Sequence, residues 1–338
     1  MSLSHPLLEL LQALAAHART AVAESLIGST AGERSRSTGH AGSDVIYAID
    51  QAVETGLVRL LEERAETLGG IVLVAEGIGE NEISVYPAGR ADGECAWRML
   101  VDPIDGTRGI MMDKRSAWFL AGAAPNRGEA TRLRDIDCSV MAELPNSRAG
   151  FSDLLSAVKG QGVEAVRHNL MLDTDPLPFR CEPYTGASVR GGFAQICRFF
   201  PGGRDELAKL EEGLWDSVFP EAKEGEILCF EDQYICTGGQ WVELMTGRDR
   251  FCADLRGTLF DSPRYEGRRR GHVCHPYDMA GLLVAEEAGV ILTDIHGNPL
   301  DAPFDTTTAV DWIGYANPAI RTEVEETLLT LIAEWGSA

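Results

Sequence analysis

The segment Met99–Arg108, with the sequence MLVDPIDGTR, constrains the fold of this 338-residue chain more than any other. An apolar run leads into Asp102, a proline stiffens the next position, and Asp105 follows before Gly106 permits a tight turn. Two carboxylates on a rigid turn at the end of a strand can point the same way, with the carbonyl group of Ile104 between them. Hard oxygen ligands in this arrangement suit Mg²⁺.

A plain Asx-type turn is the alternative interpretation of the same residues. Asp, Pro and Gly are all common in turns, so an isolated Asp-Pro-x-Asp-Gly sequence indicates a turn and nothing more. The rest of the chain has to decide between a turn and a metal site.

The remaining sequence predicts helices and strands in alternation. Apolar residues at helical spacing predict helices over Leu7–Ile27, Asp44–Leu68 and Asp278–Ala288, and Pro318 opens a last helix to about Trp335. Short apolar runs predict strands over Ile71–Ala75, Met99–Val101, Ala117–Ala121, Ser139–Ala142, Val290–Thr293 and Trp312–Ala316. Alternation in both halves predicts a layered α/β or α+β architecture.

A chain of this length has room for about two domains. The proline-rich stretch Asp175–Pro183 is the best candidate boundary. We therefore predict an N-terminal α+β half over residues 1–183, which carries most of the acidic motifs, and a C-terminal α/β half over residues 184–338, which carries Asp278.

The net charge of −22 limits the partners that the chain can bind. A surface this acidic repels nucleic-acid backbones, so we expect no nucleic-acid binding. Taken alone, the charge would also argue against an anionic substrate. Because five of the acids, four of them metal ligands, are assigned to one site below, divalent cations would reverse the sign of the charge there.

The first apolar segment, Leu7–Ile27, carries Glu9, Arg19 and Glu24, so it predicts a packed amphipathic helix and no membrane span. It also lacks the basic leader of a secretory signal. The eight cysteines are scattered without a CxxC pair, as a reduced chain tolerates. We therefore expect a cytoplasmic protein with no membrane association.

Four ordered motifs together resemble those of the inositol monophosphatase and fructose-1,6-bisphosphatase superfamily of metal-dependent, often lithium-sensitive phosphatases. They are Asp44 and Asp50 in a helix-borne pattern, Ala75-Glu76-Gly77 after a strand, Asp102-Pro-Ile-Asp-Gly-Thr107, and Tyr277-Asp-Met-Ala-Gly running to Glu287-Ala-Gly289. The tail around Thr293–Leu300 and Gly314–Asn317 also fits. The resemblance spans roughly Asp44 to Asn317 and implies a layered α-β-α-β-α sandwich.

The resemblance implies a role for each matching residue. It assigns Glu76, Asp102, Asp105, Asp278 and the carbonyl group of Ile104 to two or three Mg²⁺ ions, and Asp50 with Thr107 to the water that attacks the phosphate. A hydroxyl group alone is a poor base, so the carboxylate partner is chemically required. Asp278 is expected at the start of a helix, whose free amides and dipole would then face the anion. Substrate-binding residues are expected at Gly106, Thr107, Arg108, Gly238 and Gly239.

The chain also departs from the pattern, which leaves the substrate open. Gly77 replaces the second acid of Gly-Glu-Glu, Arg108 replaces an aromatic residue, and Tyr277 stands where Trp is usual. Extra material lies over Val189–Tyr234 and Arg256–Arg270.

The resemblance predicts a phosphomonoesterase, commonly dimeric, acting on a small phosphorylated polyol, sugar or nucleotide. A sugar bisphosphatase, a 3′-phosphoadenosine phosphatase and a non-catalytic protein that binds phosphate ligands are the alternatives. Arginines at 108 and 268–270 are candidates for a second phosphate, although a solvated face or an oligomer contact is the favoured interpretation of the run at 268–270. The amides of Gly238 and Gly239 are candidates for contact with a substrate, and a plain turn is the alternative. His272 and His275 raise the possibility of a zinc site without further ligands of suitable spacing.

Overall fold

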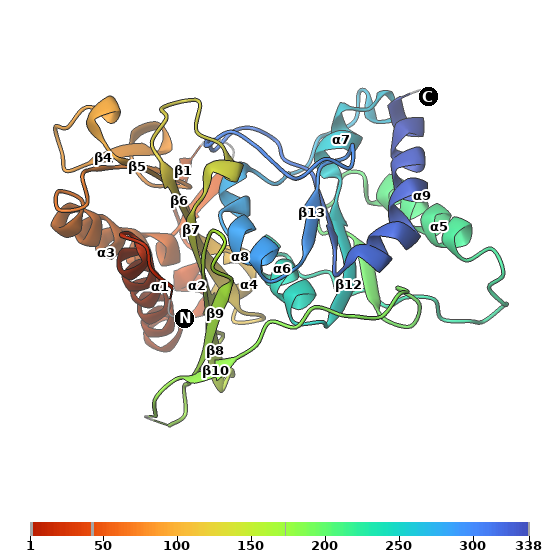
Figure 1. Cartoon of the computed structure of the whole chain (residues 1–338), viewed down its shortest axis with the longest axis horizontal. Coiled ribbons are helices and arrows are strands. Elements are labelled where there is room, and N and C mark those ends of the chain that lie inside the picture. The colour runs from red at the N-terminus through yellow and green to blue at the C-terminus, as the bar shows by residue number, and fades with distance from the viewer. Residues whose placement is uncertain (1–2, 42–43, 173, 337–338) are drawn as a thin grey trace.

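The computed structural model describes residues 3–41, 44–172 and 174–336 and arranges them in five layers. Helices α1 (Leu8–Gly28) and α3 (Ala48–Arg64) form one outer layer, and helices α5 (Arg204–Val218) and α9 (Pro318–Gly336) form the other. Two sheets lie inside them, and helices α6 (Thr237–Met245) and α8 (Leu282–Glu287) pack between the sheets (Figure 1). The predicted layered α-β-α-β-α sandwich is therefore confirmed.

The larger sheet has eight strands in the order β10-β9-β8-β7-β6-β5-β3-β4. Their bounds are β3 Ile71–Ala75, β4 Ile83–Tyr86, β5 Trp97–Asp105, β6 Ala117–Pro125, β7 Cys138–Leu144, β8 Phe151–Val158, β9 Val163–Asn169 and β10 Leu177–Phe179. Among the described strands of this sheet, β3 and β5 are the one pair that runs in parallel, with Ala75 opposite Val101. Because Ala75 lies opposite Val101 in this parallel pair, the next residues along the two strands lie side by side, namely Glu76 just after β3 and Asp102 within β5.

Alternation along β5 fixes which way its acids point. Met99 and Val101 belong to the apolar cluster under α1 and α3, whereas Leu100 belongs to the cluster that includes α6 and α8. Side chains two residues apart share a face of a strand, so Asp102 lies on the face of Leu100. Asp102 therefore points toward the middle layer of the sandwich.

The smaller sheet has four strands in the order β11-β12-β14-β13. Their bounds are β11 Phe193–Ile196, β12 Asp249–Asp254, β13 Ile291–Thr293 and β14 Trp312–Tyr315. The two sheets lie on either side of the predicted boundary at residue 183. One apolar cluster nevertheless contains residues of both halves, with the rings of Trp241 and Trp312 5.7 Å apart within it. The two halves thus share a core.

The predicted helix over Asp44–Leu68 is too long at both ends. Residues Asp44–Tyr47 form strand β2, which pairs with β1 (Ser37–Ala41), and the helix begins at Ala48 and ends at Arg64. The extended backbone of Tyr47 places it before the first turn, where its N–H donates to Oδ2 of Asp50 at 2.7 Å. The side chain of Asp44 lies outside the described residues. Short helices α2 (Ala31–Arg34), α4 (Thr107–Met111) and α7 (Arg256–Asp261) complete the fold.

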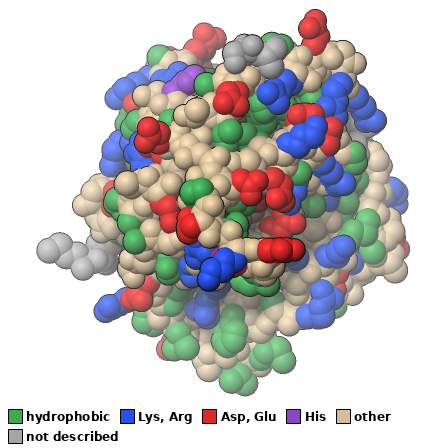
Figure 2. Space-filling view, turned by 90° about the vertical axis from the view of Figure 1, so that its right-hand side faces the viewer, with side chains coloured by type: hydrophobic (Ala, Val, Ile, Leu, Met, Phe, Trp, Pro, Cys, Tyr) green, Lys and Arg blue, Asp and Glu red, His purple; other side chains and the backbone are tan. Residues whose placement is uncertain are grey.

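None of the described helices is long and apolar enough to cross a membrane. All eight cysteines are free thiols. Acidic and basic side chains are intermixed on the face shown in Figure 2. Side chains of both signs lie beside one another there, so this face is not a single acidic field.

Candidate metal centre

A β-bulge in β5 brings the two acids of the central motif to one face of the sheet. Asp102 pairs with Leu120 and Asp105 pairs with Trp118, so β5 advances three residues while β6 advances two. In a regular strand, residues three apart point to opposite faces. The extra residue turns Asp105 to the face of Asp102.

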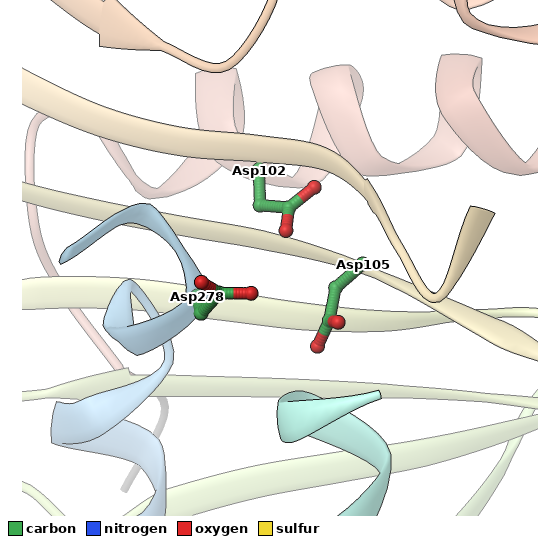
Figure 3. A group of neighbouring side chains, drawn as sticks. All are labelled: Asp102, Asp105 and Asp278. Atoms are coloured by element: carbon green, nitrogen blue, oxygen red, sulfur yellow. The ribbon is translucent and has the colours of Figure 1, made fainter. Parts of the chain in front are cut away.

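Asp278 approaches these two acids from the second half of the chain. It lies in a 3₁₀ turn, Pro276–Met279, and its Oδ2 accepts the N–H of His275 at 2.6 Å. Carboxylate oxygens of Asp102, Asp105 and Asp278 all lie within 4.8 Å of one another. Figure 3 shows the three side chains converging, two from β5 and one from the 3₁₀ turn. Three such acids can share a divalent cation.

The expectation that Asp278 begins an α-helix is wrong. Helix α8 starts four residues later, at Leu282, and Gly281 precedes it. The 3₁₀ turn starts at Pro276, whose missing N–H and fixed φ suit a first position. The amides of α8 therefore do not surround Asp278, and the dipole argument made from the sequence does not apply.

A glycine in β6 allows the turn that carries Asp278 to reach the sheet. A Cβ atom at Gly122 would lie 2.7 Å from the carbonyl oxygen of Ala280 and 2.6 Å from Cδ1 of Ile136. Oγ of Ser139, on the neighbouring strand, lies 2.8 Å from the same carbonyl oxygen. The backbone next to Asp278 is thus fixed against β6 and β7 at a distance that only glycine permits.

Backbone amides hold the carboxylates of β5 in place. The N–H of Ile104 donates to Oδ1 of Asp102 at 2.9 Å. The N–H groups of Thr237 and Gly238, at the start of α6, donate to Asp105 at 3.2 and 2.6 Å. Gly106 has a φ of +94°, which glycine adopts without strain, and a Cβ atom there would lie 3.1 Å from Cβ of Cys236. Both the turn and this close contact therefore favour glycine. The acids are positioned before any cation binds.

Burial raises the pKa of every acid in this group. For Asp102 the shift is large, and Glu76, Asp105 and Asp278 add to it by charge repulsion. Burial raises the pKa of Asp105 to about 6, against the opposing effect of its hydrogen bonds. Partial burial and the charge of Asp105 raise that of Asp278. Clustered buried carboxylates need a compensating cation to ionise together, and hard oxygen donors fit Mg²⁺.

Binding of Mg²⁺ should therefore be stronger at pH 7.5 than at pH 5.5. The raised pKa values mean that the metal-free folded state holds more protons than the unfolded state, so these groups favour folding as the pH falls through about 6. Mg²⁺ must displace those protons, so it should raise the melting temperature by a few degrees at pH 7.5 and by clearly less at pH 5.5. Differential scanning fluorimetry with and without Mg²⁺ measures this. Equal stabilisation at the two pH values would contradict it.

A cavity of about 70 Å³ opens around the three acids. Eight of the predicted site residues line it, namely Glu76, Asp102, Ile104, Asp105, Gly106, Thr107, Arg108 and Asp278. A water-sized group needs roughly 10–15 Å³ by this measure, so several such groups fit. Among the described residues, the remaining predicted site residues, Asp50, Gly238 and Gly239, do not line the cavity.

These remaining residues have identifiable contacts elsewhere. Asp50 lies in the first turn of α3, where it accepts the N–H of Tyr47. The N–H of Gly238 donates to Asp105, and that of Gly239 donates to Sγ of Cys236 at 3.2 Å. Gly238 thus supports one acid of the candidate metal centre, and both glycines lie in the first turn of α6. Their amides as contacts for a substrate, and Asp50 as the partner of Thr107, stay predictions.

Other residues that line the cavity were not predicted from the sequence as part of this site. They include Phe199, Phe200, Arg256, His272 and Cys274. Arg256 is buried, 5% exposed, and the rings of Phe199 and Phe200 lie 5.2 and 5.4 Å from its guanidinium carbon. The motif Asp254-Leu-Arg256 at the end of an apolar run is the one signal that would have pointed to it.

The arginine run at 268–270 is engaged in surface ion pairs. Arg268 pairs with Asp205 at 2.8 Å, and Arg270 pairs with Asp261 at 2.5 Å. Among the described residues, none of this run lines the cavity. The solvated-face interpretation therefore has more support than a phosphate-binding role.

The histidine pair does not form a zinc site with the acids. In the described part of the chain, the group of side chains able to hold a metal consists of Asp102, Asp105 and Asp278. Nδ1 of His275 lies 3.0 Å from the carbonyl oxygen of Thr308, and the ring of His272 packs on Phe200. Both rings thus have structural contacts.

No protein-family model matches the sequence, and no curated protein matches it. Solved structures do. Fructose-1,6-bisphosphatase from Leishmania major superimposes with a TM-score of 0.63 at 13% identity, covering 97% of this chain and 94% of that one. The IMPase of Thermotoga maritima gives 0.57 at 17% identity, covering 97% and 100%. Inositol monophosphatase from Anabaena gives 0.56 at 14% identity, covering 97% and 95%.

Identities this low establish the fold and leave the activity to be argued from the site. The match extends over nearly the whole of both chains in each case, so no large part of the molecule lies outside it. The chain has the fold shared by the inositol monophosphatases and fructose-1,6-bisphosphatases.

Proposed function

We propose that this chain is a divergent member of the inositol monophosphatase and fructose-1,6-bisphosphatase superfamily. In this proposal it is a Mg²⁺-dependent phosphomonoesterase that acts on a small phosphorylated polyol, sugar or nucleotide. The observation that carries the proposal is the convergence of Asp102, Asp105 and Asp278 within 4.8 Å, in a cavity also lined by Glu76. The fold that the chain shares with known phosphatases supports it.

The acids would hold the cation. Asp102, Asp105 and Asp278 supply carboxylate oxygens, and Glu76 and the carbonyl group of Ile104 line the same cavity. We infer two or three Mg²⁺ ions, because four carboxylates gathered in one cavity need more than one divalent charge to balance them. When bound, such ions polarise the phosphoryl group, stabilise the leaving oxygen and lower the pKa of water.

Thr107 is proposed to orient the attacking water. Its hydroxyl group donates to the carbonyl oxygen of Ile104 at 2.7 Å, which leaves the lone pairs of Oγ1 to accept a hydrogen bond from a water in the cavity. A carboxylate must take the proton, because a threonine hydroxyl is too weak a base at neutral pH. We propose Asp50 for that role.

Arg108 is the substrate-binding candidate at the mouth of the cavity. Its side chain is exposed, and its guanidinium carbon lies 5.8 Å from the ring centroid of Phe200. An arginine fork suits phosphate oxygens. A sugar bisphosphatase or a 3′-phosphoadenosine phosphatase, whose substrates each carry a second phosphate, therefore remains the alternative within the same chemistry.

A phosphate-release screen of the purified chain tests the proposal. Sugar, inositol and nucleotide phosphates would be incubated with Mg²⁺ and the released phosphate measured. Release from at least one substrate supports hydrolysis and names the substrate class. Silence across the panel, combined with binding of those compounds, would instead support the non-catalytic protein that binds phosphate ligands.

We also infer a cytoplasmic homodimer, for which light scattering should give twice the chain mass of 36.6 kDa.

Lithium provides a separate test of the metal arrangement. We expect Li⁺ at millimolar concentration to inhibit Mg²⁺-dependent phosphate release, because the phosphatases that the motifs resemble are often lithium-sensitive. The measurement is the initial rate as Li⁺ is increased at fixed Mg²⁺, with Na⁺ at the same ionic strength as the control. An equal response to the two ions would count against the usual metal arrangement of the superfamily and leave hydrolysis itself untouched.

A further inference from the structure

The buried ion pair between Arg256 and Asp254 lies at the edge of the metal cavity. Asp254 ends β12 and Arg256 begins α7, and the two side chains are 1% and 5% exposed. Nε and Nη2 of Arg256 donate to the two carboxylate oxygens of Asp254 at 2.8 and 2.6 Å. Each member of a buried pair of this kind depends on the other, because removing one leaves an uncompensated charge.

Arg256 also forms hydrogen bonds with the segment that leads to Asp278. Its Nη1 donates to the carbonyl oxygen of His272 at 2.8 Å, and its Nη2 donates to Sγ of Cys274 at 3.3 Å. Sγ of Cys274 in turn lies 3.4 Å from Oδ2 of Asp254. One guanidinium group thus joins the end of β12 to two residues before Asp278. It contacts the backbone of His272, six positions before Asp278, and the side chain of Cys274, four positions before it.

The same cluster reaches the second acid through Thr237. Sγ of Cys274 lies 3.6 Å from Oγ1 of Thr237, and the N–H of Thr237 donates to Oδ1 of Asp105. The contacts therefore run from Arg256 to the surroundings of both Asp278 and Asp105. These two acids come from opposite halves of the chain, and their separation decides whether a cation can bridge them.

The guanidinium group is engaged by the protein in a way that suits positioning more than substrate binding. All three of its nitrogen atoms donate to protein acceptors, namely Asp254, His272 and Cys274. Its charge is close enough to oppose the rise in the pKa of Asp278 that burial and Asp105 produce. A fixed fork of this type cannot be replaced by the single ammonium group of lysine.

We propose that Arg256 is a positioning residue that sets the place of Asp278 relative to Asp105 and so determines the affinity of the cavity for divalent cations. The inference rests on the proposed metal site. Partners that hold metal ligands in place contribute about 10- to 100-fold to metal affinity in proteins. Arg256 should contribute an effect of that size even though it does not itself touch the cation.

The test is the affinity of purified wild-type and variant chains for Mn²⁺, followed by electron paramagnetic resonance, with no substrate present. Arg256→Lys keeps the positive charge but loses the fork, and we expect Mn²⁺ to bind about 10- to 100-fold more weakly. Arg98→Lys is the matched control. Arg98 is equally buried and pairs with Asp92 at 2.9 Å, at the far end of β5. The Arg98→Lys variant should change Mn²⁺ affinity less than about twofold, which separates the general effect of replacing a buried guanidinium group from its effect beside the cavity.

Wild-type affinity in folded Arg256→Lys would overturn the inference. If that variant does not fold, Cys274→Ala decides, because it keeps the ion pair and removes one of the two links from Arg256 to the segment before Asp278. It should weaken Mn²⁺ binding by more than about twofold, and unchanged affinity would overturn the inference. Failure of the wild-type chain to bind Mn²⁺ at all would have a different meaning, since it would contradict the proposed metal site itself.

Discussion

Replacing Asp105 by asparagine is expected to abolish Mg²⁺-dependent phosphate release. The substitution removes one of three converging carboxylates while preserving the size of the side chain. Polarisation by a bound cation supplies several kcal/mol of transition-state stabilisation, and losing about 4 kcal/mol corresponds to roughly a 1000-fold lower kcat. The measurement is steady-state phosphate release, with circular dichroism to check that the variant is folded.

The fold should survive this substitution because the carboxylate of Asp105 is costly to bury. Burial raises its pKa to about 6, so a neutral amide avoids that cost while its oxygen still accepts one of the two amides from Thr237 and Gly238. Asp249→Asn is the matched control. Burial raises the pKa of Asp249 to about 7, and this residue begins β12 away from the cavity. Near wild-type turnover in Asp105→Asn would exclude the metal assignment.

Replacing Gly122 by valine should destabilise the chain and disrupt the metal centre together. A Cβ atom there would come within 2.7 Å of the carbonyl oxygen of Ala280, and a backbone atom held by Ser139 cannot move away like the end of a flexible side chain. Overpacking of this kind costs about 3 kcal/mol or more when the backbone must shift. The segment carrying Asp278 would have to move off the sheet. Stabilisation by Mg²⁺ should therefore shrink as well.

Chemical denaturation with and without Mg²⁺ measures both effects. Gly213→Val is the control, since a Cβ atom at Gly213 in α5 meets no atom within 4 Å. We expect its unfolding free energy to change by less than about 1 kcal/mol, with an unaltered response to Mg²⁺. A Gly122→Val variant that behaves like this control would show that Gly122 does not set the approach of Asp278.

Local sequence predicted the elements whose pattern is complete within a few residues. The strand Ile71–Ala75 and the last helix from Pro318 were predicted from apolar runs and a proline and are confirmed. The helix predicted over Asp44–Leu68 was too long. Its first residues, Asp44 to Tyr47, gain their hydrogen bonds by pairing with β1, a partner that helical spacing does not reveal. Pairing with a neighbouring strand decides such cases.

The candidate site divides in the same way. The motif around Asp102 and Asp105 pointed to a shared face, and the bulge that produces it involves β5 and its neighbour only. The place of Asp278 depends on Gly122 and Ser139, about 150 residues away, although the four ordered motifs had already associated it with the acids of β5. The signal for Arg256 in the sequence was limited to the motif Asp254-Leu-Arg256 at the end of an apolar run. Its proposed role arises from contacts with Asp254, two residues before it, and with His272 and Cys274 in the segment that leads to Asp278.

The most direct measurement is phosphate release by the wild-type chain as its metal is removed and restored. The purified chain would be assayed with its best substrate from the panel, treated with chelator, and supplied again with Mg²⁺. We predict that release falls to background without metal and returns when Mg²⁺ is added. Release that persists in the chelated chain, or no release from any phosphate in the panel with Mg²⁺ present, would contradict the proposed function.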